Sequence, residues 1–110
     1  MGKLKTDVAF IEKSGRTFSK RTEYYENGQV AQVGVYVNNQ RDWSWTIPTG
    51  VVKSYFENGQ LKSEISYNEN GSLEGESNYF NSEGKLVKKL RYSKDILQEE
   101  VIYEAETEKL

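Results

Sequence analysis

The side chains of this 110-residue chain that could do chemistry are carboxylates, lysines and tyrosines, because the chain has no histidine and no cysteine. Zinc sites built from Cys and His, and nucleophiles activated by a histidine base, are therefore excluded. General acid catalysis by a carboxyl group needs a desolvated pocket that raises the pKa of the acid. The candidate carboxylates instead lie in turn sequences or on polar strand faces, which indicates a solvated surface: Glu26, Glu57, Glu64, Glu74, Glu76, Glu99 and Glu100.

Two other patterns could bind a charged ligand. The glycines do not open a helix in the arrangement of a phosphate-binding loop. Basic residues between Lys85 and Arg91 could attract anionic lipid, but Glu74 and Glu76 are expected on the adjacent strand. The net charge of −2 argues against nucleic acid, which needs concentrated Lys and Arg. We therefore expect no enzyme, no cofactor and no metal ion.

One turn sequence occurs three times in the chain. "YYENGQV" starts at Tyr24, "YFENGQL" at Tyr55 and "YFNSEGKL" at Tyr79. Asn and Gly tolerate the left-handed backbone that tight hairpin turns require. "SEG" in the third copy carries one extra residue, which predicts a longer loop or a bulge there. Each copy therefore predicts the bend of a β-hairpin.

Apolar and polar residues alternate with a period of two between these turns, as in strands with one covered face. In each of the segments Leu61–Tyr67, Leu73–Tyr79 and Leu86–Tyr92, we expect every second residue, counted back from the tyrosine, to point to one common face. Seven tyrosines are expected on that face. The fold class is all-β, a single elongated, twisted antiparallel meander with strands near 7–13, 17–26, 30–38, 51–57, 60–68, 72–80, 85–93 and 96–104.

The C-terminal segment 95–110 has two readings. As a strand it would place Leu97, Glu99, Val101 and Tyr103 on the tyrosine side. As a short helix it would start at Asp95, with a capping box closed by a glutamine three residues on. The repeat spacing favours the strand, and the helix remains the alternative.

These residues resemble the bacterial variant of the MORN repeat (membrane occupation and recognition nexus). The similarity is strongest over Tyr55–Gly75, and it is weaker in the first copy at Val33 and Gly34. The last copy has Asp95 in place of a terminal glycine. The resemblance implies hairpins stacked into one long sheet. We expect one domain, 1–110, with repeats at about 16–50, 51–78 and 79–104.

An insert at 37–51 interrupts the first repeat and holds both tryptophans, Trp43 and Trp45, and the proline Pro48. On a strand, the two indoles would share a face. They could fold back as a lid over the tyrosines, anchor a protein partner, or stack on a sugar.

Too little chain is left to cover the tyrosine side, so we expect a surface for another protein. The resemblance implies an antitoxin or immunity-type protein that occludes the active site of a cognate toxin. The alternative is a structural or self-associating domain, or a membrane-associated scaffold. We expect a cytoplasmic location, no membrane span, and edge strands that leave a homo-oligomer open. The expected partner-binding residues are Trp43, Trp45, Arg41, Asp42, Tyr36, Tyr67 and Tyr92.

Overall fold

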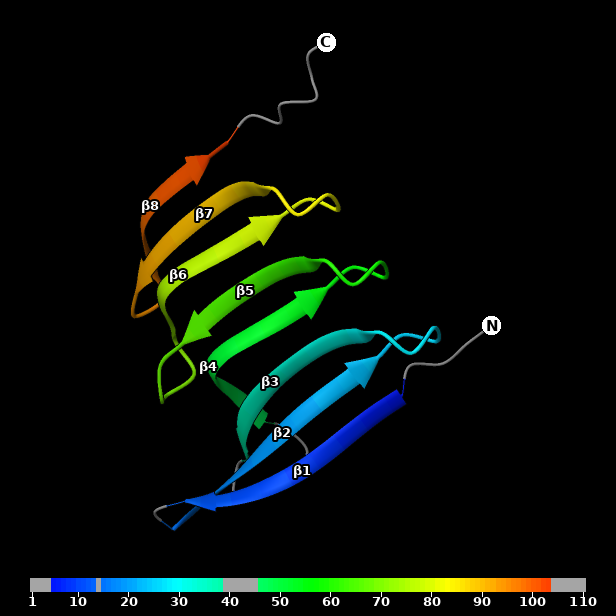
Figure 1. Ribbon diagram of the computed structural model, residues 1–110. Helices are drawn as coiled ribbons and strands as arrows, with labels where there is room; N and C mark the ends of the chain where they lie inside the picture. Colours follow the sequence, from blue (N-terminus) through cyan, green and yellow to red (C-terminus); the bar gives the residue numbers. More distant parts are fainter. Residues whose placement is uncertain (1–4, 14, 39–45, 104–110) are drawn as a thin grey trace.

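The computed structural model is one antiparallel sheet of eight strands, in which each strand pairs with its neighbours in sequence (Figure 1). It describes residues 5–13, 15–38 and 46–103. The molecule extends over 54 × 39 × 20 Å, as a thin sheet should. The all-β meander is therefore confirmed. The strands are β1 (Lys5–Lys13), β2 (Arg16–Tyr24), β3 (Val30–Asn38), β4 (Thr46–Tyr55), β5 (Leu61–Tyr67), β6 (Leu73–Phe80), β7 (Leu86–Ser93) and β8 (Ile96–Ile102).

The C-terminal segment forms a strand as far as Ile102, so the alternative of a short helix is wrong for these residues. None of the segments that the structure describes forms a helix with the length and apolarity to cross a membrane.

Four turns share one hydrogen-bond pattern, including the third copy of the turn sequence. In the first, Gly28 N donates to Tyr25 O at 2.9 Å and Tyr25 N donates to Gln29 O at 2.8 Å. In the third copy, Gly84 N donates to Asn81 O at 2.9 Å and Asn81 N to the carbonyl four residues on. Of the two predicted alternatives, the longer loop is therefore wrong, and a bulge is present, since the register shifts between Tyr79 and Phe80. The extra residue lies before the turn, so that Phe80 and not Tyr79 takes the position of Tyr24 and Tyr55.

The turns that follow β2, β4 and β6 are bonded to one another along one margin of the sheet, on the right in Figure 1. Asn27 Nδ2 donates to Glu57 O at 3.0 Å, and Asn58 Nδ2 donates to Ser82 O at 3.0 Å. Tyr25 Oη also donates to Tyr55 O at 2.6 Å. The asparagine of the repeated turn therefore has a second function, which is to join one hairpin to the next.

The strand register defines two faces. We call the tyrosine face the side that carries Tyr36, Tyr67, Tyr79 and Tyr92, and the valine face the opposite side. Tyr79 lies between Ser63 of β5 and Lys88 of β7, and Ser77 lies between Ile65 and Leu90. The expected faces are therefore confirmed from Ser63 to Tyr67, from Leu73 to Tyr79 and from Lys88 to Tyr92. They are wrong for Leu61, which pairs with Tyr55, and for Leu86, which pairs with Phe80, because a register shift places both leucines on the valine face.

The expectation that seven tyrosines share one face is wrong. Tyr24 lies opposite Lys5, whose Nζ is 5.8 Å from the centre of its ring, on the valine face. Tyr55 faces a hollow there with Thr22 and Val33. In both strands the register shifts immediately before the tyrosine. Such a bulge adds a residue to one strand and breaks the alternation of faces.

The register also shifts between Arg91 and Tyr92, and this shift changes the expected faces of β8. Leu97 lies opposite Tyr92 on the tyrosine face, as expected. Glu99, opposite Arg91, and Val101, opposite a lysine, lie on the valine face instead. Tyr103 follows the last residue of the strand.

The described part of the insert lengthens the hairpin of β3 and β4, and β4 begins at Thr46, five residues earlier than predicted. Val37 pairs with Ile47, and Tyr36 with Pro48. Pairing of β4 with β5 begins only at Gly50, so Pro48 stands where β4 is locally an edge strand. A proline without a backbone N–H is tolerated at such a position.

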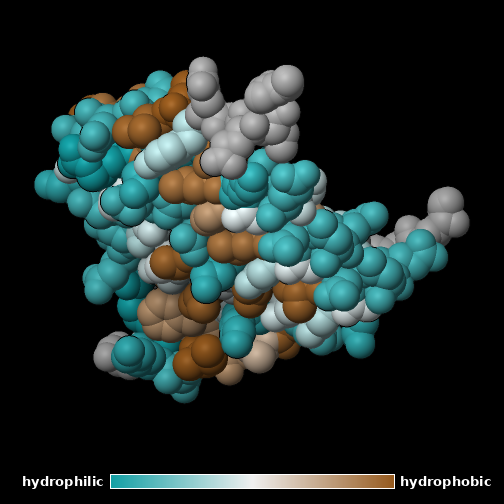
Figure 2. Space-filling view, turned by 45° about the horizontal axis from the view of Figure 1, so that its top comes forward, coloured by the Kyte–Doolittle hydropathy of each residue, from teal (hydrophilic) through white to brown (hydrophobic). Residues whose placement is uncertain are grey.

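The core is small, as the composition predicts. Among the described residues, the buried hydrophobic side chains are Ala31, Val37, Val52 and Leu90, and the buried polar ones are Ser19, Ser63 and Ser77. Figure 2 shows separate hydrophobic clusters among hydrophilic residues on the side in view.

Candidate protein-binding surface

Each tyrosine of the tyrosine face stands opposite a serine or glycine of the preceding strand. The pairs are Tyr36 with Ser19, Tyr67 with Gly50, Tyr79 with Ser63, and Tyr92 with Gly75. Small residues weaken a strand by themselves but leave room for a neighbouring ring. The four tyrosines are half-buried, whereas the two serines are only 1% and 7% exposed. The rings therefore supply much of the cover of a sheet that has no second layer in its described part.

Tyr36 is held by polar contacts as well as by packing. Gln32 Nε2 donates to Tyr36 Oη at 3.2 Å, and Ser54 Oγ donates to Gln32 Oε1 at 3.3 Å. Its ring folds back along β3, so that a Cβ on Gly34 would lie 3.2 Å from Tyr36 Oη. These contacts join β3 to β4 and orient the hydroxyl.

The tyrosine hydroxyls influence one another across the sheet. Burial raises the pKa of the Tyr67 hydroxyl above the ordinary value of 10.0, and Tyr36, Tyr79 and Asp95 raise it further. Burial also raises the pKa of Tyr79, with an added contribution from Tyr92. An ionised phenolate is disfavoured by low hydration and by nearby negative charge. Tyr36 and Tyr79 therefore lie close enough to Tyr67, and Tyr92 close enough to Tyr79, to disfavour the ionised form of these two groups.

The raised pKa values predict a loss of stability in alkali. Below the unfolded-state value near pH 10, Tyr67 and Tyr79 are neutral in both the folded and the unfolded protein, and their stabilising contribution is complete. Above it the unfolded chain ionises first, so the free energy of unfolding falls as the pH rises towards the folded pKa values. Urea unfolding across this range should show a smaller fall for the double variant Tyr67→Phe/Tyr79→Phe. An identical fall in the two proteins would contradict the assignment of this pH dependence to Tyr67 and Tyr79. The lysines are the same in both proteins and therefore serve as an internal control.

Cations accompany the rings of the tyrosine face. Lys88 Nζ lies 5.0 Å from the centre of the Tyr79 ring, and Arg21 Cζ lies 5.5 Å from that of Tyr36. Arg21 Nε is buried without a hydrogen-bond partner. Such pairs are weakly favourable. Tyr and Arg are also the residue types that dominate binding energy at protein interfaces.

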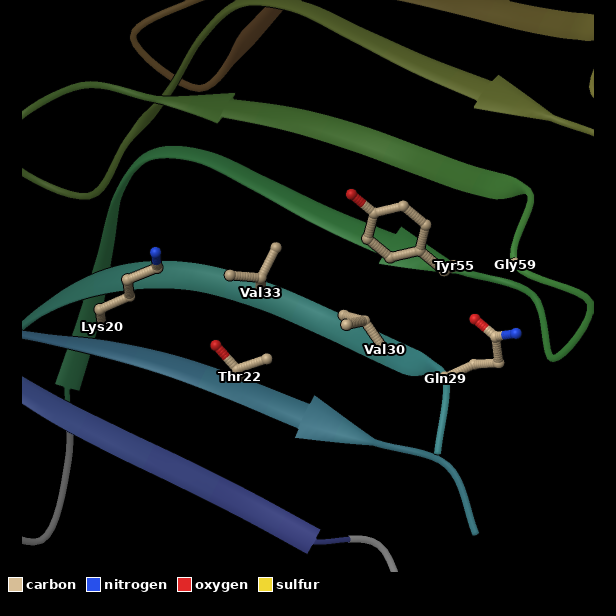
Figure 3. Close-up of a pocket in the computed structure, with 7 residues that line it drawn as sticks. All are labelled: Lys20, Thr22, Gln29, Val30, Val33, Tyr55 and Gly59. Atoms are coloured by element: carbon tan, nitrogen blue, oxygen red, sulfur yellow. The ribbon is translucent and has the colours of Figure 1, made fainter. Parts of the chain in front are cut away.

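Two hollows lined by described residues lie on the valine face, and sequence reasoning missed both. One, of about 430 Å³, lies over β2, β3 and the hairpin of β4 and β5, and Figure 3 shows its lining residues. The other, of about 650 Å³, includes Ile11, Phe18, Val35 and Val51. The sequence feature that could have indicated these hollows is the run of alternate valines in β3. Glu69 is the one carboxylate lining either hollow, and it is exposed, so neither hollow provides a desolvated general acid.

The structure brings Tyr36, Tyr67 and Tyr92 of the expected partner-binding residues to one face, and adds Tyr79 between them. The other four expected residues, Trp43, Trp45, Arg41 and Asp42, lie outside the described residues. No group of three or more His, Cys, Asp or Glu among the described residues could hold a metal ion.

Comparison with protein families finds the MORN repeat variant at residues 20–38, 48–69 and 64–81. The chain contains MORN repeats. The second and third matches overlap at β5, because this strand closes one hairpin and opens the next. Strands β1, β7 and β8 lie outside the matched MORN segments. Neither the curated proteins nor the solved structures include a significant match.

Proposed function

We propose that this MORN-repeat chain is a protein-binding module of the antitoxin or immunity type, which neutralises a toxin by covering its active site. The supporting observation is the row of four half-buried tyrosines, accompanied by Arg21 and Lys88, on one side of a single-layered sheet. Rigid aromatic side chains already held in place lose little conformational entropy when a partner binds. A broad face of this kind suits steric occlusion and not catalysis.

The charges disfavour the alternative of a scaffold on anionic lipid. Lys88 lies on the tyrosine face, whereas Lys89 and Arg91 alternate onto the valine face. There Lys89 Nζ lies 3.8 Å from Glu76 Oε1, and Arg91 Nε lies 3.2 Å from Glu99 Oε1. The basic cluster of the sequence is thus divided between two faces and partly neutralised. A single basic surface, which lipid attraction requires, is not formed by these residues.

The test is co-expression with the reading frames adjacent to the gene, with growth and complex formation as the measurements. A neighbouring product that arrests growth alone should be tolerated and co-purified when this chain is present. Tyr67→Lys and Tyr92→Lys should each weaken the complex by about 100-fold, the effect of losing an interface hot spot.

The matched control is Val51→Lys, since Val51 is 47% exposed on the valine face. This variant should bind normally, and thermal unfolding should show that all three variants fold. The absence of both a complex and growth rescue would refute the proposed function. Loss of binding in the Val51 variant alone would assign the partner to the other face.

A further inference from the structure

The two edge strands of the sheet differ in how they are protected against pairing. All nine residues of β1 are exposed, and they include the apolar run from Val8 to Ile11. Val8 is 43% exposed, Phe10 67% and Ile11 44%. An exposed edge of this length and apolarity is a template for another strand. We propose that β1 pairs with β1 of a second copy, so that two chains form one continuous sheet.

Edge β8 is less suited to the same contact. It also exposes apolar residues, Ile96 and Ile102 among them, but Glu99 and Glu100 occupy its centre. Two-fold pairing centred on either glutamate would place like charges directly opposite each other, which is destabilising. Charged residues within an edge strand are a common protection against pairing. The centre of β1, from Val8 to Ile11, has no charge.

The sequence of β1 also selects a register. In a two-fold antiparallel pair, opposite residues must point to the same face, so the axis passes through one residue. With the axis at Phe10, Asp7 lies opposite Lys13 of the second copy, and this ion pair occurs twice. Phe10 faces its own copy, and Ala9 faces Ile11. With the axis at Ala9, Lys5 would instead face Lys13. Charge complementarity therefore favours the Phe10 axis.

This contact is independent of the proposed function. It uses the backbone edge of β1 and leaves the tyrosine faces of both copies uncovered. It also lies outside the matched MORN segments, which begin at Lys20. The dimer would then carry two tyrosine faces side by side.

The test is the molar mass of the full chain by sedimentation velocity or light scattering over a concentration series. The wild type should reach twice the 12.7 kDa of one chain. Phe10→Lys places two lysines at the axis and should give a monomer. The matched control is Ile102→Lys on β8, where the side chain is 70% exposed, and it should leave the dimer intact. Far-UV circular dichroism should show that both variants fold.

Charge exchange tests the register separately. Asp7→Lys should weaken the dimer at least about tenfold, and Asp7→Lys with Lys13→Asp should restore it, since the two ion pairs are then reversed. A monomeric wild type at every concentration, or a dimer that survives Phe10→Lys, would overturn the proposal. A dimer abolished by Ile102→Lys would also overturn it, because β8 would then be the contact. Failure of the double charge exchange would overturn the Phe10 axis.

Discussion

Replacing Gly71 with alanine is expected to destabilise the protein by about 3 kcal/mol, from backbone strain and steric overlap together. Gly71 lies in the turn between β5 and β6 with φ +85°, a conformation that favours glycine. A Cβ built at this position would also overlap Ile47 Cγ2. Ile47 belongs to β4, so this turn packs against the described part of the insert. The loss would be measured by urea unfolding, in which the dependence of the unfolding free energy on urea concentration should stay as in the wild type.

Gly28→Ala separates the two effects. Gly28 has φ +90° in a turn with the same hydrogen bonds, but nothing lies within 4 Å of the added Cβ. This control should lose about 1 kcal/mol, the strain of the backbone alone. Adding Ile47→Ala to Gly71→Ala removes the overlapping methyl group and should make the two changes less than additive. Equal losses in the Gly71 and Gly28 variants would show that the contact is absent.

Replacing Asp95 with alanine is expected to cost about 2 kcal/mol of unfolding free energy, from the lost hydrogen bond of the carboxylate and from strain. Asp95 is in the two-residue turn between β7 and β8, where Lys94 has φ 49° and Asp95 has φ 72°. Positive φ at both positions is typical of a type I′ turn. Asp95 Oδ1 accepts from Leu73 N at 2.7 Å, and Asp95 N donates to Leu73 O at 2.9 Å. The turn is thereby bonded to the start of β6.

Asn and Gly variants of Asp95 separate the contribution of the carboxylate hydrogen bond from that of backbone strain. Asp95→Asn keeps an acceptor oxygen and tolerates the left-handed backbone, so it should lose less than about 1 kcal/mol. Asp95→Gly removes the acceptor but relieves the strain, and it should fall between the other two. The measurement is again the free energy of unfolding in urea. An alanine variant as stable as the asparagine variant would contradict this account.

The turns and the strand order could be predicted from sequence because both are encoded over a few residues. The pairs Asn27–Gly28 and Asn58–Gly59 mark hairpin bends by backbone preference alone. Between them, the alternation from Ser63 to Tyr67 fixes which residues share a face. Short turns then require each strand to pair with the next.

The faces of Tyr24, Tyr55 and Glu99 could not be predicted in this way. Each lies beside a register shift, and a shift depends on how two strands pair. One unpaired residue reverses every later assignment in that strand. Simple alternation was therefore sufficient inside strands and failed at their ends.

The candidate surface was predictable in part. Tyr36, Tyr67 and Tyr92 were identified from their recurrence, and the structure places them on one face. Tyr79 was expected on this face from the alternation of its strand, but it was not among the expected partner-binding residues. The small residues opposite each ring also belong to other strands, so single-strand patterns could not reveal them.

The strand order β1 to β8 has a consequence for biosynthesis. None of the eight described strands pairs with one made much later, so closing each hairpin costs little chain entropy. Low contact order of this kind favours rapid folding. The growing polypeptide can add hairpins to a folded template as it leaves the ribosome, and β8 is the last to dock. A stalled or shortened chain would therefore keep its earlier hairpins and lose only those not yet synthesised.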